Sequence, residues 1–165
     1  MAGEASFDVV SEFDRQELVN ALDQVRREVA TRYDFKGVTA DIELGAGELT
    51  VLTDSEARAA AIRDLIGSKA VRRGLSLKIF DWGRVEPAGG NRVRQVVTLR
   101  RGLPEDLAKK IVRLVREDFP KAHAQIQGDA VRISGKSKDE LQKVIARLRA
   151  DGEAYPVPLQ FQNYR

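Results

Sequence analysis

The feature that most constrains the fold is a repeat in the spacing of apolar residues. Strand-like and helix-like stretches follow one another in the same order twice along the 165 residues. Apolar residues that alternate with polar ones indicate half-buried strands, and apolar residues three and four apart indicate helices with one buried face. The alternating stretches of the first occurrence are 6–12, 38–44, 49–52 and 75–79. The helical stretches begin at the capping residue Asp14 and at the segment Thr53-Asp54-Ser55, which offers an N-cap, and end near Tyr33 and Gly74. This order is βαββαβ.

The same order begins again after the segment Glu86–Asn91, whose proline and paired glycines make it the best candidate for a linker. The alternating stretches here are 92–101, 122–126, 131–133 and 159–161. Pro104 suits the first turn of one helix, and Ser137 with Glu140 forms a capping box for another. Two such units predict an α+β protein with two antiparallel sheets, each covered by helices on one face, as in ferredoxin-like domains.

Composition excludes several classes of protein. The chain has no cysteine and one histidine, which excludes disulfides, zinc ribbons, thiol nucleophiles and most transition-metal sites. We therefore expect no cofactor and no metal. No apolar run approaches the ~20 residues that span a bilayer, and the first residues lack the basic and apolar regions of a signal peptide. We expect a soluble, cytoplasmic protein that does not associate with a membrane.

No motif for catalysis is complete. Gly135–Ser137 ends like a phosphate-binding loop, but Ala130 stands where the first glycine of that loop is required. His123 lies in an alternating stretch, and the sequence has no G-x-S-x-G turn of a serine hydrolase. Carboxylates at helix starts, such as Asp14 and Glu140, are explained by capping and the helix dipole. We expect no enzymatic activity and no catalytic residue.

The net charge of +3 is unevenly distributed along the chain. Residues 1–90 carry 12 Lys+Arg and 16 Asp+Glu, a balance of −4, while residues 91–165 carry 16 and 9, a balance of +7. This asymmetry favours an anionic partner for the second half. The alternative is that the charges only keep both halves in solution.

Five segments carry a resemblance to a known family. They are Ser6–Glu12, Arg32–Val38, Ala124–Asp129, Val131–Gln142 and Pro158–Arg165. Together they resemble the bacterial YajQ family of nucleotide-binding proteins, in order along nearly the whole chain. The resemblance implies two ferredoxin-like domains in tandem that exchange their N-terminal strands. The first domain would be 13–101, completed by strand 92–101, and the second would be 102–165 together with strand 6–12.

The resemblance also implies a function. Members of the family bind nucleotides, with cyclic di-GMP the ligand for some and GTP or RNA suggested for others. We therefore expect a non-enzymatic nucleotide-binding protein, a cyclic di-GMP effector that signals through a protein partner such as a transcription regulator. The alternative is an RNA-binding or RNA-chaperone module that uses the same basic surface.

Alternation places a polar set on the face of the second sheet that the helices leave open. That face is predicted to hold His123, Gln125, Gln127, Arg132, Ser134, Lys136, Gln160 and Gln162. Amides such as Gln125 and Gln127 can pair with the edge of a base. Arg132 and Lys136 can meet a phosphate. These four are predicted nucleotide-binding residues, and the alternative is an ordinary solvated sheet face.

The first half offers a second candidate surface. Arg94 and Arg100 lie on one side of strand 92–101, in a regular basic row that can follow phosphates, and are also predicted nucleotide-binding residues. Phe80 and Trp82 are predicted on the open side of the preceding strand. There they could stack on a base or seal an interface with another domain.

Overall fold

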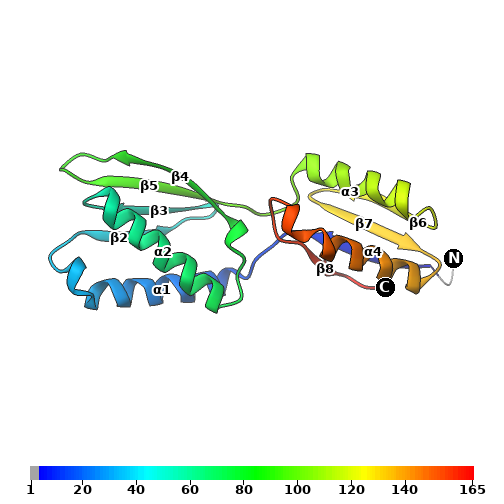
Figure 1. Ribbon diagram of the computed structural model, residues 1–165, viewed down its shortest axis with the longest axis horizontal. Coiled ribbons are helices and arrows are strands. Elements are labelled where there is room, and N and C mark those ends of the chain that lie inside the picture. The colour runs from blue at the N-terminus through cyan, green and yellow to red at the C-terminus, as the bar shows by residue number, and fades with distance from the viewer. Residues whose placement is uncertain (1–3) are drawn as a thin grey trace. The chain divides into compact units, whose positions relative to one another are not determined.

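The computed structural model describes residues 4–165, which form two antiparallel sheets of four strands, each with two α-helices (Figure 1). The strands are β1 (Ala5–Val10), β2 (Ala40–Leu44), β3 (Glu48–Thr53), β4 (Phe80–Pro87), β5 (Val93–Leu99), β6 (Ala122–Gln127), β7 (Ala130–Gly135) and β8 (Gln160–Gln162). The α-helices are α1 (Arg15–Thr31), α2 (Glu56–Arg72), α3 (Glu105–Asp118) and α4 (Lys138–Ala150). Short 3-10 helices are η1 (Tyr33–Phe35), η2 (Leu77–Ile79) and η3 (Gly152–Ala154). The predicted α+β fold of two ferredoxin-like βαββαβ units is confirmed.

Three of the α-helices begin at the predicted capping residues. Asp14 caps α1, Ser55 caps α2 and Ser137 caps α4, each through a side-chain oxygen that accepts a hydrogen bond from a backbone N–H of the first turn. Helix α3 begins directly after Pro104. The apolar stripes of these helices are buried, so each helix packs one face against a sheet.

Each sheet takes a central strand from the other βαββαβ repeat, and β1 is also far along the sequence from the strands with which it pairs. The strand orders are β6-β7-β1-β8 and β2-β3-β5-β4. In the sheet that contains β1, Phe7 of β1 stands opposite Ile133 of β7, and Val9 stands opposite Phe161 of β8. In the other sheet, β5 lies between β3 and β4. This is the strand exchange that the family resemblance implies.

The buried apolar residues form two clusters, one beneath each pair of helices. Helices α1 and α2 lie on one face of the sheet that contains β5, and α3 and α4 lie on one face of the sheet that contains β1 (Figure 1). Within residues 4–165, no α-helix of the same unit covers the opposite face of either sheet. Those open faces are where alternation places the polar side chains.

The chain divides into two compact units. The β5 unit is Phe13–Arg100, and the β1 unit is Arg101–Arg165 together with the segment that ends at Glu12. The β5 unit has 15 Lys+Arg and 13 Asp+Glu, and the β1 unit has 13 and 12, so their balances are +2 and +1. The charge asymmetry between the halves of the sequence therefore disappears, and it gives no reason to assign an anionic partner to one unit.

The segment Glu86–Asn91 is not a linker, which corrects the sequence interpretation. Strand β4 runs to Pro87 and pairs with β5, so the segment belongs to a hairpin within one sheet. Its turn uses Gly89, Gly90 and Asn91, all with positive φ. The chain passes between the units at residues 12–13 and 100–101 instead.

The predicted strand 75–79 is also wrong. The hydroxyl of Ser76 accepts a hydrogen bond from the N–H of Lys78 at 3.1 Å and begins the 3-10 helix η2, and β4 starts only at Phe80. The alternation therefore shifts by one residue. Phe80 is buried in the core, and Trp82 packs against it with ring centroids 5.4 Å apart. Neither ring lies on the open face, so neither can stack on a base there.

We expect Phe7→Ala to destabilise the β1 unit by about 3–5 kcal/mol, because Phe7 is 1% exposed and fills the core from the exchanged strand. Hydrogen exchange measured by mass spectrometry should accelerate in β7 and β8, which flank β1. Helix α1 follows β1 directly in the sequence but belongs to the β5 unit, and it should keep its protection. Loss of protection in α1 with β7 unchanged would contradict the exchange.

Candidate functional site

The open face of the β1-unit sheet carries a row of polar side chains that crosses all four strands. The register places Gln125 of β6 opposite Arg132 of β7, Arg132 opposite Asp8 of β1, and Asp8 opposite Gln162 of β8. Neighbouring strands lie about 4.8 Å apart, so adjacent members of this polar row can contact one small ligand.

Asp8 and Arg132 form a bidentate ion pair at the centre of the polar row. Arg132 donates from Nε to Asp8 Oδ1 at 2.9 Å and from Nη2 to Asp8 Oδ2 at 3.3 Å. Asn163 donates from Nδ2 to Asp8 Oδ2 at 2.9 Å. The side chain of Asp8 is 10% exposed, whereas that of Arg132 is 33% exposed. The carboxylate is therefore enclosed by its partners, and the guanidinium is held in place with part of its surface open to a ligand.

The hydrogen bond from Arg132 holds the pKa of Asp8 below its usual range. Burial of Asp8 acts in the opposite direction, and the hydrogen bond from Asn163 lowers the pKa further. The same ion pair raises the pKa of Arg132. Both groups are therefore charged at neutral pH, and the polar row as a whole is close to neutral.

The remaining predicted residues of this unit lie at different places along the β6–β7 hairpin. Gln125 and Gln127 are exposed, and Gln127 is at the turn, opposite Ala130. Lys136 is exposed just beyond the end of β7, four residues and about 13 Å from Arg132. The structure thus brings Gln125 and Arg132 together, with Gln127 and Lys136 flanking them at opposite ends of the hairpin.

Arg94 and Arg100 lie in the β5 unit, so the six predicted residues do not gather in either unit. Arg94 is exposed on β5 and stands opposite Glu86 of β4. The exposed carboxylates of this sheet face are Asp41, Glu43, Glu48, Asp81 and Glu86. The expected basic row therefore lies among acidic residues, which weakens its attraction for phosphate.

Arg100 is engaged by its own unit. Its Nη1 donates to the backbone carbonyl oxygens of Lys78 and Phe80 at 3.1 and 3.4 Å. Its Nη2 lies 3.6 Å from Asp81 Oδ1. These contacts hold the end of β5 against the start of β4, so Arg100 has a structural role in addition to any contact with a ligand.

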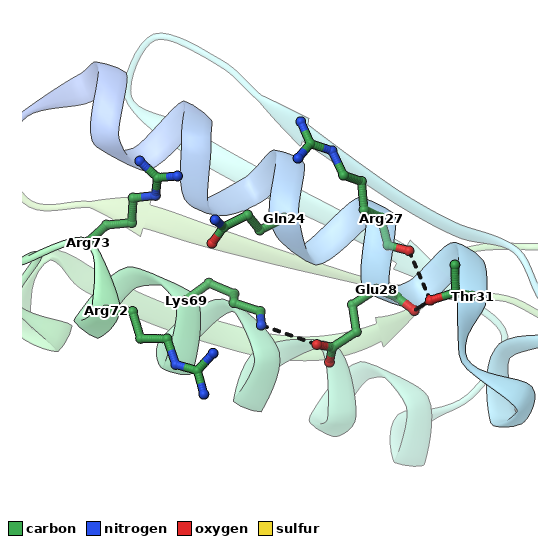
Figure 2. A pocket seen from close by; sticks show the side chains of 7 residues that line it. All are labelled: Gln24, Arg27, Glu28, Thr31, Lys69, Arg72 and Arg73. Atoms are coloured by element: carbon green, nitrogen blue, oxygen red, sulfur yellow. Dashed lines mark hydrogen bonds and ion pairs between the residues drawn. The ribbon is translucent and has the colours of Figure 1, made fainter.

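A groove that sequence reasoning missed lies between α1 and α2 on the helix side of the β5 unit (Figure 2). It is shallow and has a volume of about 680 Å³. The residues that line it are Gln24, Arg27, Glu28 and Thr31 of α1, Lys69 and Arg72 of α2, and Arg73. Figure 2 shows the amide of Gln24 between Arg73 and Glu28 along the groove.

The α1–α2 groove has an excess of positive charge. Lys69 Nζ lies 3.1 Å from Glu28 Oε1, and Arg73 Nη1 lies 3.5 Å from Glu17 Oε2. Within residues 4–165, the guanidinium groups of Arg27 and Arg72 have no ion-pair partner. Two unpaired guanidinium groups and two ion pairs make a surface that attracts anions.

A weak signal for this groove was present in the sequence. Arg26-Arg27 and Arg72-Arg73 are adjacent basic pairs at helical positions. Bringing Arg27 and Arg72 to one groove requires α1 and α2 to pack side by side, which no local pattern shows. The groove could therefore be recognised only from the tertiary structure.

The two surfaces provide amide, guanidinium and ammonium groups. In the described part of the chain, no group of three or more His, Asp or Glu side chains is placed to hold a metal ion. None of the helices within residues 4–165 is long and apolar enough to cross a bilayer. Fold and surfaces together define a two-unit ferredoxin-like protein suited to bind polar or anionic ligands through hydrogen bonds and charge.

Comparison with known proteins identifies the family. Residues 5–165 match the family described as nucleotide-binding protein YajQ-like, and the chain belongs to that family. It is 56% identical to a nucleotide-binding protein of Roseiflexus castenholzii and 57% identical to one of Chloroflexus aggregans. A nucleotide-binding protein of Trichormus variabilis is 54% identical. Each match covers 165 residues and the full length of both chains.

We expect Asp8→Asn to lower the free energy of unfolding at pH 7 by about 2–3 kcal/mol, because it removes a nearly buried carboxylate from a bidentate pair. The pKa of Asp8 is lowered in the folded state, so its contribution is present above the unfolded pKa and is lost as pH falls through the folded pKa. The difference between wild type and variant should therefore shrink below about pH 4 in urea titrations.

A matched control is Asp118→Asn, which breaks the exposed ion pair with Arg147 on the surface of the same unit. We expect a change below about 1 kcal/mol, because exposed pairs contribute little. If Asp8→Asn lowered the free energy of unfolding as much at about pH 2.5 as at about pH 7, the stabilising role assigned to the ionised Asp8 would be contradicted.

Proposed function

We propose that the protein is a non-enzymatic nucleotide-binding protein of the cytoplasm, with its ligand on the open face of the β1-unit sheet. The observation that carries this proposal is the polar row, in which Gln125 and Arg132 stand side by side. An amide and a fixed guanidinium offer the paired donors and acceptors that the edge of a base requires. The relatives support the ligand class, because they bear the name nucleotide-binding protein.

Asp8 prepares Arg132 for this role. It takes the Nε and Nη2 donors and so fixes the plane of the guanidinium before a ligand arrives. Asp8 leaves both N–H groups of Nη1 and one N–H group of Nη2 unused. A guanidinium donates to O6 and N7 of guanine in the commonest specific contact between arginine and a base. The polar row therefore favours a guanine nucleotide.

We propose cyclic di-GMP as the guanine nucleotide that the protein binds, and a GTP-like nucleotide as the alternative ligand. Such ligands extend beyond one base and carry phosphates. Gln127 and Lys136, at the two ends of the hairpin, are proposed to contact these outer parts. In this proposal the loaded protein acts as an effector and passes its signal to a protein partner such as a transcription regulator.

The second candidate function is an RNA-binding or RNA-chaperone module. The observation that favours it is the α1–α2 groove, where Arg27, Lys69, Arg72 and Arg73 offer a positively charged path for a phosphate backbone. Arg94 and Arg100 remain a competing nucleotide site on the open face of the β5-unit sheet.

Calorimetric titration with cyclic di-GMP, GTP and ATP tests the proposed site. We expect Gln125→Ala to weaken cyclic di-GMP by about 3- to 10-fold, because one neutral hydrogen bond contributes about 0.5–1.5 kcal/mol. Arg132→Lys should weaken it by at least as much, because lysine keeps the charge beside Asp8 but loses the planar fork. Arg132→Ala is a poorer probe, since it leaves Asp8 enclosed without its partner.

Two controls separate this site from the alternatives. Gln142→Ala removes an exposed amide from α4 of the same unit and should leave affinity unchanged. Arg94→Ala tests the β5-unit sheet. A large loss in Arg94→Ala with unchanged affinity in Gln125→Ala would move the site to that sheet, and no loss in either would remove both assignments.

The salt dependence of binding separates a discrete nucleotide from RNA. Consider single-stranded RNA with three phosphates neutralised by protein cations. A plot of log binding constant against log salt concentration should have a slope near −2, about −0.7 for each phosphate, because counterions are released from the RNA. Cyclic di-GMP should show a shallower slope. Submicromolar RNA binding with a steep slope, beside no heat from cyclic di-GMP at about millimolar concentration, would favour the RNA-binding function.

A further inference from the structure

A second pocket lies at the corner where α1 ends and the chain turns into β2, in the β5 unit. It has a volume of about 660 Å³, within the size range of small-molecule sites. Its floor includes Val29, Val38 and Ala40, which also pack against the core of the unit. Thr31 lines both this corner pocket and the α1–α2 groove, so the two hollows adjoin.

Tyr33 lines the corner pocket and is 89% exposed, more than any other exposed large hydrophobic residue within residues 4–165. An exposed tyrosine ring offers a ligand a large, flat apolar face together with a hydroxyl group. Tyr33 has no aromatic neighbour among the ring pairs of residues 4–165. Its ring is thus presented to solvent beside the corner pocket.

The backbone that carries Tyr33 is firmly held. Arg32 donates from Nε and Nη2 to the two carboxylate oxygens of Asp34 at 2.9 and 2.8 Å. Arg58 of α2 donates from Nε to the carbonyl oxygen of Asp34 at 3.0 Å. Phe35 is 4% exposed and anchors the turn in the core. Because these contacts hold the turn in place, less conformational entropy is lost when a ligand stacks on the Tyr33 ring.

The lining of the corner pocket contains three cationic side chains and no carboxylate. Arg26 is engaged by Asp23 and by the carbonyl oxygen of Ile42, and Arg32 is engaged by Asp34. Lys36 is exposed and has no ion-pair partner among residues 4–165. One ammonium group is therefore available beside the aromatic ring and the apolar floor.

We propose that the corner pocket binds a nucleobase stacked on Tyr33, with the attached phosphate at Lys36. An aromatic face, an apolar floor and one unpaired cation match the two parts of a nucleotide, since every base offers a face for stacking. The pocket is in the β5 unit and shares only the ligand class with the proposed function. Loss of binding in Tyr33 variants and loss in Gln125 variants are therefore distinguishable.

The test follows backbone amide signals of the full-length protein by NMR during titration with GMP, guanosine and ribose 5-phosphate. We expect GMP to shift the amides of Tyr33–Gly37 and ribose 5-phosphate to bind at least 5-fold more weakly. Tyr33→Ala should weaken GMP by about 5- to 150-fold, which corresponds to ~1–3 kcal/mol of stacking. Tyr33→Phe should stay within about twofold of wild type, because it keeps the aromatic face.

Tyr164→Ala is the matched control, since it removes a 58% exposed tyrosine from the other unit and should leave these shifts unchanged. Lys36→Gln should weaken GMP but not guanosine. If a tetraribonucleotide shifts the same amides more strongly than GMP and Tyr33→Ala abolishes those shifts, the result supports the pocket and identifies unpaired RNA as the source of the bound nucleotide. Unchanged GMP affinity in Tyr33→Ala, equal affinity for ribose 5-phosphate, or Tyr33-dependent self-association without nucleotide shifts would overturn the proposal.

Discussion

Everything else in the structure depends on the exchange of one central strand in each sheet. Strand β1 pairs on both edges, with β7 and with β8, and it brings Phe7 and Val9 into the core of the β1 unit. Without it, the inner edges of β7 and β8 would be left unpaired, and a sheet of this size would lose its stable form. The β1 unit therefore requires the strand β1, which is separated in the sequence from the rest of the unit by all the residues of the β5 unit.

The same exchange creates the candidate site. Asp8 arrives with β1, while Arg132 belongs to β7, and their bidentate pair exists only when the exchanged strand is in place. A ligand that contacts Arg132 therefore also contacts a pair that holds the sheet together. At the proposed site, stability and binding are therefore coupled through Arg132. Gln125, on the edge strand β6, lies on the same open face without taking part in that pair.

Local chemistry predicted most of the fold, because caps and alternation act over a few residues. Asp14, the segment Thr53–Ser55 and Ser137 marked helix starts, and alternation correctly set Gln125 and Arg132 on one face. The residues from Leu75 to Ile79 were wrongly predicted to be a strand. Five alternating positions are compatible both with a strand and with the 3-10 turn that Ser76 caps. Asp8 and the α1–α2 groove were missed for a different reason. Their importance comes from neighbours that only sheet pairing and helix packing supply.

The balance of charge in this protein differs between surfaces rather than between halves of the sequence. In the β5 unit, carboxylates surround Arg94 and Arg100 on the open sheet face, while cations outnumber the one carboxylate that lines the α1–α2 groove on the helix side. An anionic ligand that meets this unit is therefore drawn to the helices. The polar row of the β1 unit is nearly neutral, since Asp8 balances Arg132, so it can select a ligand by hydrogen-bond geometry more than by charge. Because phosphate contacts position a nucleotide while base contacts specify it, the polar row is suited to reading a base edge and the α1–α2 groove to holding phosphates.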